Sequence, residues 1–142
     1  MRPTLVLFDI DGTLVDAAGA GRRGLEESFR RVFGIDDIAD FASRVRFGGL
    51  SDATIIAAIA REAGLPADVI EARYVELQAA YLDALRFELK RPDPRRRVMP
   101  GVRPLLDTLA SRPDVHLGLV TGNVEEGARA KLEAFGLNRY FK

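Results

Sequence analysis

Two short apolar runs stand out in a chain that is otherwise patterned for helices. They cover residues 4–10 (TLVLFDI) and residues 115–121 (VHLGLVT), and each ends close to polar side chains. Short runs that lack alternation between apolar and polar residues are typical of strands buried on both faces of a parallel sheet. We therefore expect two parallel strands with polar residues at their carboxyl ends.

The rest of the chain has helical periodicity. It predicts helices over residues 18–33, 52–63, 67–90, 102–111 and 124–135. The clearest apolar stripe, at spacings of three or four, consists of Ile70, Tyr74, Leu77, Tyr81, Leu85 and Leu89. Such a stripe indicates a helix face packed in a core. Asn123 precedes the last helix, and we expect its side chain to cap that helix.

The order of these elements predicts an α/β fold. A strand is followed by a helical block, a Pro- and Arg-rich linker at residues 91–101, and then a helix, a strand and a helix. Sheets in α/β domains usually have about four to six strands. Because only two strands are predicted, we expect these residues to be the N-terminal part of a longer domain with an incomplete sheet.

Composition and charge narrow the function classes. Lysine plus arginine and aspartate plus glutamate balance at 21 each, so no net field favours nucleic acid or an anionic membrane as partner. There are no cysteines, which excludes disulfides, thiolate nucleophiles and zinc–thiolate sites. No apolar run approaches the ~18 residues of a membrane span. We expect a soluble, cytoplasmic protein.

The candidate chemistry begins where the first run ends. Asp9 and Asp11 flank Ile10, so their side chains point the same way from an extended chain. Two close carboxylates repel unless a cation or proton lies between them, and one pKa can then be raised. One carboxylate can serve as nucleophile and metal ligand while the other donates and accepts a proton. Taken alone, the pair also fits the cap of a turn, which Gly12 would permit.

A longer string decides between these interpretations. Residues 8–16 (FDIDGTLVD) resemble the first motif of phosphohydrolases of the haloacid dehalogenase superfamily. The resemblance implies that Asp9 attacks phosphorus to form an aspartyl phosphate, while Asp11 protonates the leaving oxygen and then activates water. It also implies a Mg²⁺ ion held by the Asp9 carboxylate and the backbone carbonyl of Asp11. The dehalogenase branch generally lacks the second aspartate, so Asp11 favours phosphoryl chemistry.

Two further segments resemble motifs of the same family. Residues 119–123 (LVTGN) resemble the second motif, which implies that Thr121, Gly122 and Asn123 bind the phosphoryl group together with the turn at Gly12. Lys131, in ARAKLEAFGL (128–137), stands where the family has its basic residue. The fourth motif, whose acidic residues complete the Mg²⁺ shell in relatives, has no counterpart here.

The helical block resembles the C1-type cap of the phosphoglycolate-phosphatase-like branch. This implies a Rossmann-like core formed by residues 1–15 and 98–142, a cap formed by residues 16–97, and hinges at 16–21 and 91–98. We expect the loop RVRFGGLSD (44–52) to set specificity. Arg44 or Arg46 could contact a substrate carboxylate, as could Arg22 or Arg23 early in the cap, although all four are also typical of solvated surface arginines. Ser51 and Asp52 are expected to cap the next helix.

These observations favour a Mg²⁺-dependent phosphatase acting on a small phosphorylated metabolite, with 2-phosphoglycolate as the preferred substrate. We expect a monomer or a homodimer. One alternative is a sugar-phosphate mutase of the β-phosphoglucomutase type, which would use the same aspartate pair. Another is a catalytically incomplete fragment that acts as a phosphate-binding module.

Overall fold

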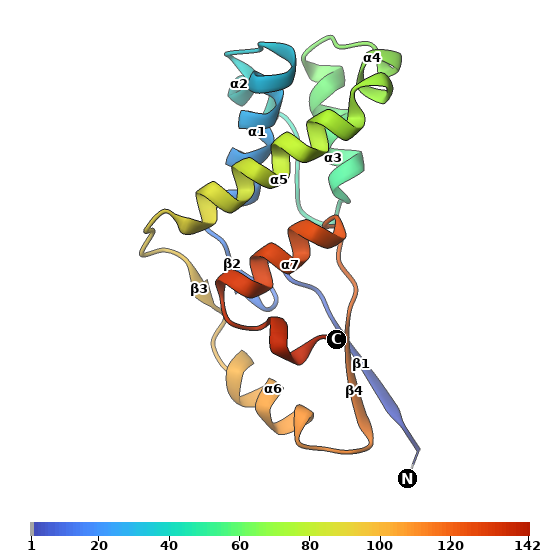
Figure 1. Cartoon of the computed structure of the whole chain (residues 1–142), viewed down its shortest axis with the longest axis vertical. Coiled ribbons are helices and arrows are strands. Elements are labelled where there is room, and N and C mark those ends of the chain that lie inside the picture. The colour runs from blue at the N-terminus through green and yellow to red at the C-terminus, as the bar shows by residue number, and fades with distance from the viewer. Residues whose placement is uncertain (1) are drawn as a thin grey trace.

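A parallel strand pair forms one end of the molecule and a group of helices forms the other (Figure 1). The computed structural model describes residues 2–142. Strands β1 (Thr4–Phe8) and β4 (Val115–Leu119) pair in parallel, with Thr4 opposite Val115 and Phe8 opposite Leu119. Both predicted strands are confirmed, but each ends two residues earlier than expected. The polar residues therefore lie in the loops just beyond the strands.

Two helices cover one face of this strand pair. Helices α6 (Val102–Ala110) and α7 (Glu125–Ala134) lie on the same side of it (Figure 1), and the short helix η1 (Asn138–Tyr140) follows α7. The buried residues that they enclose are Ile10, Leu14, Val15, Val102, Leu106, Ala128, Leu132, Leu137 and Phe141. This small cluster fixes the orientation of both loops that leave the strands.

The opposite face of the pair is open to solvent. Leu5 and Leu7 on β1 are 63% and 52% exposed. The prediction that the first strand is buried on both faces is therefore wrong for the described residues. The reason is geometric, because the side chains of a strand alternate between two faces and α6 and α7 cover only one of them.

The two predicted hinges lie next to each other. Strand β2 (Val15–Asp16) pairs antiparallel with β3 (Arg97–Val98), so the chain enters and leaves the helical segment at one place. Ala18, just after β2, has a φ of 52°, which costs an L-residue about 1–2 kcal/mol. The helical segment is thus joined to the strand end through a narrow connection with one strained residue.

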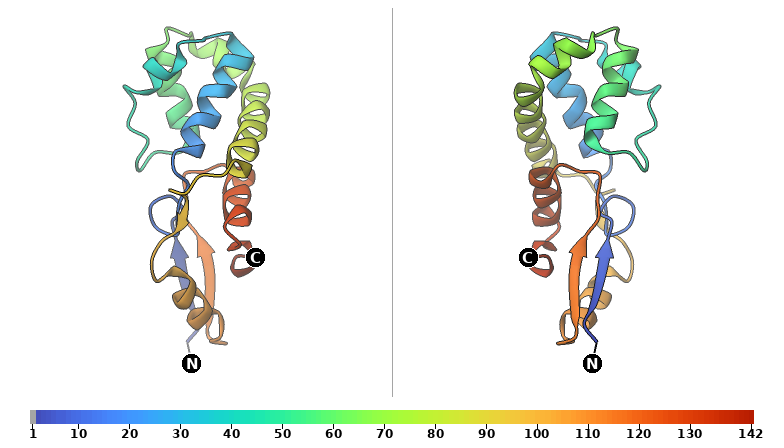
Figure 2. Two further views of the ribbon diagram at one scale, coloured as in Figure 1. Left: turned by 90° about the vertical axis from the view of Figure 1, so that its left-hand side faces the viewer. Right: turned by 90° about the vertical axis from the view of Figure 1, so that its right-hand side faces the viewer.

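Five helices make up the inserted segment: α1 (Ala20–Phe33), α2 (Ile38–Ala42), α3 (Asp52–Glu62), α4 (Ala67–Ala72) and α5 (Tyr74–Lys90). Further views show them stacked above the strand pair along the long axis (Figure 2). The predicted helix over 67–90 is two helices, because Arg73 leaves helical geometry with a φ of −114°. Its Nη1 donates to the Val32 carbonyl at 2.5 Å, which ties the break to the end of α1.

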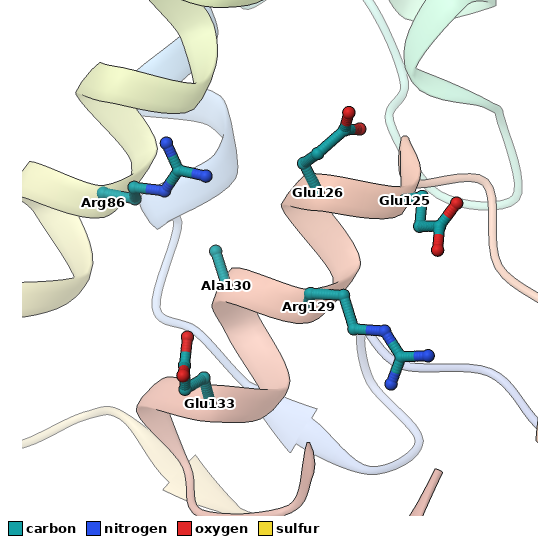
Figure 3. Close-up of a pocket in the computed structure, with 6 residues that line it drawn as sticks. All are labelled: Arg86, Glu125, Glu126, Arg129, Ala130 and Glu133. Carbon is teal, nitrogen blue, oxygen red and sulfur yellow. The ribbon is translucent and has the colours of Figure 1, made fainter. Parts of the chain in front are cut away.

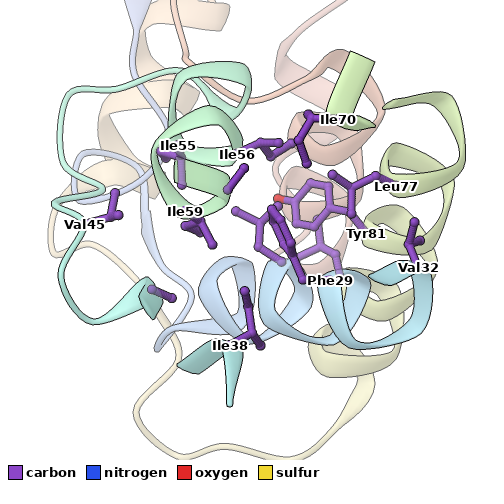
Figure 4. Packing of buried hydrophobic residues seen from close by; sticks show 14 of the residues in the cluster. Phe29, Val32, Ile38, Val45, Ile55, Ile56, Ile59, Ile70, Leu77 and Tyr81 are labelled. Atoms are coloured by element: carbon purple, nitrogen blue, oxygen red, sulfur yellow. The ribbon is translucent and has the colours of Figure 1, made fainter. Parts of the chain in front are cut away.

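The predicted apolar stripe does form the centre of a core. Ile70, Leu77, Tyr81 and Leu85 are buried, and Tyr74 and Leu89 pack at its edge. They meet Phe29 of α1 and the isoleucines of α3 (Figure 4). Helices α1 and α5 approach closely at Gly24, where an added Cβ would lie 3.2 Å from the backbone nitrogen of Leu85. In residues 2–142 no helix is long and apolar enough to cross a membrane.

Replacing Phe29 should destabilise the helical segment. Its side chain is fully buried, and deleting a buried phenylalanine ring typically costs about 3–5 kcal/mol of unfolding free energy. We expect Phe29→Ala to lower the free energy of unfolding by that amount, measured by urea unfolding followed by circular dichroism. Phe87→Ala is the control, since Phe87 is exposed and should change stability by less than about 0.5 kcal/mol. Equal effects of the two variants would show that Phe29 is not central to this core.

Candidate active site

A cavity of about 930 Å³ lies between the carboxyl ends of the strands and the helical segment. All seven residues predicted to bind or react with phosphate line it: Asp9, Asp11, Gly12, Thr121, Gly122, Asn123 and Lys131. Ligands of parallel α/β sheets bind at this end of the strands. The fold therefore brings together residues that are more than 100 positions apart in the chain.

The loop after β1 is built around one carbonyl group. The Ile10 carbonyl accepts hydrogen bonds from the backbone N–H groups of residues 13–15. Gly12 has a φ of 78° and donates its own N–H to the Val15 carbonyl at 2.9 Å. Its position at the cavity is as predicted, but its N–H is used inside the turn. This turn directs Asp9 and Asp11 toward the cavity.

Lys131 is the centre of a polar network. Its residue surface is only 5% exposed, and its Nζ donates to Asp11 Oδ1 at 2.9 Å, to Asp11 Oδ2 at 2.8 Å and to Asn123 Oδ1 at 2.7 Å. An ammonium group has three protons, so all three find acceptors. A buried cation is tolerated only when it is paired and hydrogen-bonded in this way. The network holds a positive charge beside the aspartate pair.

Asn123 joins the loops that follow the two strands. Its Nδ2 donates to Asp11 Oδ2 at 2.8 Å and to Thr121 Oγ1 at 2.6 Å. The prediction that this side chain caps the following helix is wrong, because the N-cap residue of α7 is Val124 and the Asn123 amide is engaged by the site. Local sequence favoured the cap, but the side chain bonds Asp11, which lies in the loop after the other strand.

Asp52 reaches the same place from the helical segment. Its N–H donates to the Gly122 carbonyl at 2.8 Å, and its Oδ2 accepts the Val124 N–H at 2.9 Å. The residue is only 8% exposed. Burial raises the pKa of this carboxyl above its ordinary value of 3.8, although the Val124 N–H and Lys131 act in the opposite direction. The sequence predicted that Asp52 caps its own helix. Ser51 does so, accepting the Thr54 N–H.

The two arginines predicted to set specificity do not line the cavity. Arg44 lies over the Phe41 ring and 3.6 Å from a carboxylate oxygen of Glu62, and Arg46 is exposed. Residues 47–52 of that loop line the cavity instead, together with Arg22 of α1. The Arg22 guanidinium stacks on the Phe47 ring at 3.9 Å. Sequence alone could not show which arginine faces inward, because that depends on how α1 rotates against the loop.

Tyr81 also belongs to the site, although the sequence predicted only a core position for it. It belongs to the apolar stripe of α5, yet it also lines the cavity. Burial, together with the nearby Asp52 and Asp11 carboxylates, raises the pKa of its hydroxyl above the usual value of 10. The phenol is therefore neutral at physiological pH and presents a polar tip to the cavity.

The aspartate pair offers part of a metal site. Within the part of the chain that the structure describes, no three aspartate, glutamate or histidine residues gather as a metal-binding group. Mg²⁺ is usually held by one or two carboxylates together with waters and substrate phosphate. The Asp9 carboxylate and the Asp11 carbonyl fit such a site, while both carboxylate oxygens of Asp11 accept hydrogen bonds from Lys131.

A second depression lies between α5 and α7, away from the strand ends. It is lined by Arg86, Glu125, Glu126, Arg129, Ala130 and Glu133 (Figure 3). None of the predicted site residues belongs to it. Charges of both signs on the surface of a helix are typical of a solvated face, so we assign no chemistry to this depression.

The pKa of Asp52 predicts a pH-dependent stability. A raised pKa means that the folded protein binds this proton more tightly than the unfolded chain does. The resulting stabilisation is complete below about pH 3.8 and is lost as the pH rises through the folded-state pKa. Asp52→Asn keeps an acceptor oxygen without the buried charge. We expect the variant to unfold at higher urea concentration than the wild type at pH 7, with the difference shrinking toward pH 4. A variant less stable than the wild type at both pH values would contradict this prediction.

Comparison with known proteins agrees with this geometry. The sequence model of the haloacid dehalogenase-like hydrolase family matches residues 3–142. A phosphoglycolate phosphatase from Rhodospirillum rubrum is 34% identical over 145 aligned positions, which cover 95% of this chain and 54% of that protein. The chain thus spans about half the length of this curated relative.

Solved structures share the fold at low identity. A protein described as a predicted phosphoglycolate phosphatase from Haemophilus somnus is 18% identical, with a TM-score of 0.65 over all of this chain and 61% of that one. CbbY from Rhodobacter sphaeroides, solved in complex with phosphate, is 21% identical, with a TM-score of 0.68 over 96% of this chain and 60% of that one. The match of the family model over nearly every residue, on this α/β fold, shows that the chain belongs to the haloacid dehalogenase-like hydrolase family.

Proposed function

We propose that this chain provides the aspartate pair and phosphate site of a Mg²⁺-dependent phosphatase for small phosphate monoesters. The observation that carries the proposal is the buried Lys131 ammonium bound to Asp11 and Asn123, in a cavity that Asp9 also lines. A phosphate dianion needs such fixed positive charge beside two carboxylates, which would otherwise repel it.

The proposed chemistry has two steps. A carboxylate oxygen of Asp9 attacks phosphorus, and the bond from phosphorus to the leaving oxygen breaks. Asp11, protonated once the bound phosphate has drawn the Lys131 ammonium away from it, gives that oxygen a proton. A water molecule then attacks the aspartyl phosphate, Asp11 takes a proton from the water, and phosphate leaves with Asp9 restored. Mg²⁺ bound by the Asp9 carboxylate and the Asp11 carbonyl would neutralise charge on the phosphoryl oxygens.

The remaining site residues bind the phosphoryl oxygens in this scheme. Thr121 and Asn123 bond each other in the structure, and Lys131 bonds Asp11. These groups are therefore held close together before a phosphate arrives. A bound phosphate would take over some of these bonds, aided by the N-terminus of α7, where N–H groups favour anions.

The cavity and the relative both support a proposal for the substrate class. Asp9 and Asp11 line the cavity together with residues of the helical segment, which would contact the part of the substrate away from phosphorus. The R. rubrum relative is a phosphoglycolate phosphatase. We therefore propose 2-phosphoglycolate, or a phosphorylated metabolite of similar size, as the substrate.

Replacing Asp9 should abolish phosphate release, because an amide cannot act as the nucleophile. We expect Asp9→Asn to lower the release of phosphate from 2-phosphoglycolate with Mg²⁺ by about 10³-fold or more, the scale of removing a catalytic nucleophile. Asp68→Asn, at an exposed position of α4 outside the cavity, is the matched control and should match the wild type. An active Asp9→Asn variant would exclude this mechanism. Transfer of phosphate within a sugar, without release, would instead favour the mutase alternative.

Lys131 should be needed for activity more than for folding. Lys131→Met keeps the length of the side chain but removes the charge. The Asp11 side chain is partly exposed, so water can hydrate the carboxylate oxygens that lose Lys131. We expect kcat/KM to fall at least about 100-fold, which is the scale of losing one strong electrostatic contact to the transition state. Lys90→Met at the exposed end of α5 is the control. Unchanged kcat/KM in a folded Lys131→Met variant, with folding checked by circular dichroism, would contradict the proposed role.

A further inference from the structure

Helix α7 begins without a cap from its own sequence. Its N-cap residue is Val124, which has no polar side chain, and the position where a capping-box glutamate would stand is Gly127. The first N–H groups of a helix have no partners within the helix. In many helices the side chain of the N-cap residue, or that of the third helical residue, supplies the acceptors. In α7, Val124 has an apolar side chain and Gly127 has none, so neither residue supplies an acceptor.

The acceptor for one of these groups comes from the helical insertion. Asp52 lies 72 residues earlier in the chain, at the start of α3, and its Oδ2 accepts the Val124 N–H at 2.9 Å. The carboxylate thus does what the third helical residue does in a capping box. A negative charge at a helix N-terminus also interacts favourably with the helix dipole.

A second contact makes this a two-point attachment. The Asp52 N–H donates to the Gly122 carbonyl at 2.8 Å. An added Cβ at Gly122 would lie only 2.5 Å from the Leu50 carbonyl oxygen and 2.9 Å from Ser51 Cα. The backbones of residues 50–52 and 121–124 are therefore in direct contact, without room for a methyl group.

The helix that Asp52 caps is the one that carries the phosphate site. Asn123 directly precedes Val124, and Lys131 lies further along α7. Both bind Asp11. The position of α7 therefore determines whether these two side chains meet the aspartate pair. Because Asp52 belongs to the insertion, its bond to Val124 depends on the insertion resting on the strand ends.

We propose that Asp52 is a positioning residue that caps α7 from the insertion, so that closure of the insertion over the cavity and placement of Asn123 and Lys131 on Asp11 occur together. When the insertion lifts, Val124 loses its acceptor and the start of α7 loosens. The catalytic consequence rests on the proposed phosphatase function, whereas the capping itself does not. The contact requires an acceptor oxygen, and an uncharged amide supplies one as well.

Amide hydrogen exchange tests the capping without any substrate. In Asp52→Ala we expect the amides at the start of α7, from Val124 to Ala128, to exchange at least about fivefold faster than in the wild type, the scale of a lost helix cap. Asp52→Asn should stay close to the wild type. Gly122→Ala should behave like Asp52→Ala, because the added methyl group separates the two backbones while Asp52 remains.

Ser51→Ala is the matched control for the loop. Ser51 caps α3 through the Thr54 N–H, so its loss should speed exchange at the start of α3 and leave α7 unchanged. The capping proposal is overturned if Asp52→Ala leaves exchange in α7 unchanged. It is also overturned if Asp52→Asn loosens α7 as much as Asp52→Ala does, or if Ser51→Ala loosens α7 equally.

Activity measurements separate this inference from the proposed function. We expect kcat/KM for phosphate release to fall about tenfold or more in Asp52→Ala and to recover in Asp52→Asn. Faster exchange in α7 of Asp52→Ala in a chain that releases no phosphate would support the capping and reject phosphatase activity of this chain. Full activity of Asp52→Ala despite faster exchange would show that capping does not position the site, and would overturn the proposed role of Asp52.

Discussion

The site depends on the burial of one ammonium group. Lys131 is almost fully shielded from solvent, so it needs three acceptors held in a fixed arrangement. Asp11 supplies two of them from the loop after β1, and Asn123 supplies the third from the loop after β4. The parallel pairing of the two strands brings these loops together, and the small cluster under α6 and α7 holds the helix that carries Lys131.

The helical insertion completes this arrangement from the other side. The chain enters and leaves the insertion at the paired strands β2 and β3, so both covalent connections to the insertion lie at one place. At the far end of the cavity, the contact of Asp52 with Gly122 and Val124 joins it to the phosphate loop. A buried carboxylate with a raised pKa costs stability at neutral pH. A contact of this kind is typical of sites where positioning has been favoured over stability.

Much of the fold could be predicted because its signals are local. The strands, most helices and the core stripe of α5 follow from hydrophobic periodicity, and family motifs brought Asp9, Thr121 and Lys131 to one site. What was missed depends on tertiary contacts. Asn123 has the sequence of a helix cap but bonds Asp11, and Asp52 caps a helix other than its own. Among the candidate arginines, Arg22 lines the cavity and Arg44 and Arg46 do not. This choice depends on the rotation of α1, which periodicity does not fix.

The proposed mechanism requires a covalent phosphoryl group on Asp9, which can be trapped and detected. The protein would be mixed with Mg²⁺ and a phosphate monoester that it hydrolyses, quenched rapidly in acid and digested for mass spectrometry. We expect a single phosphoryl group on the peptide that contains Asp9, and its disappearance as turnover ends. Phosphate release with no phosphorylated Asp9 at any time point, or with the phosphoryl group on another residue, would contradict it.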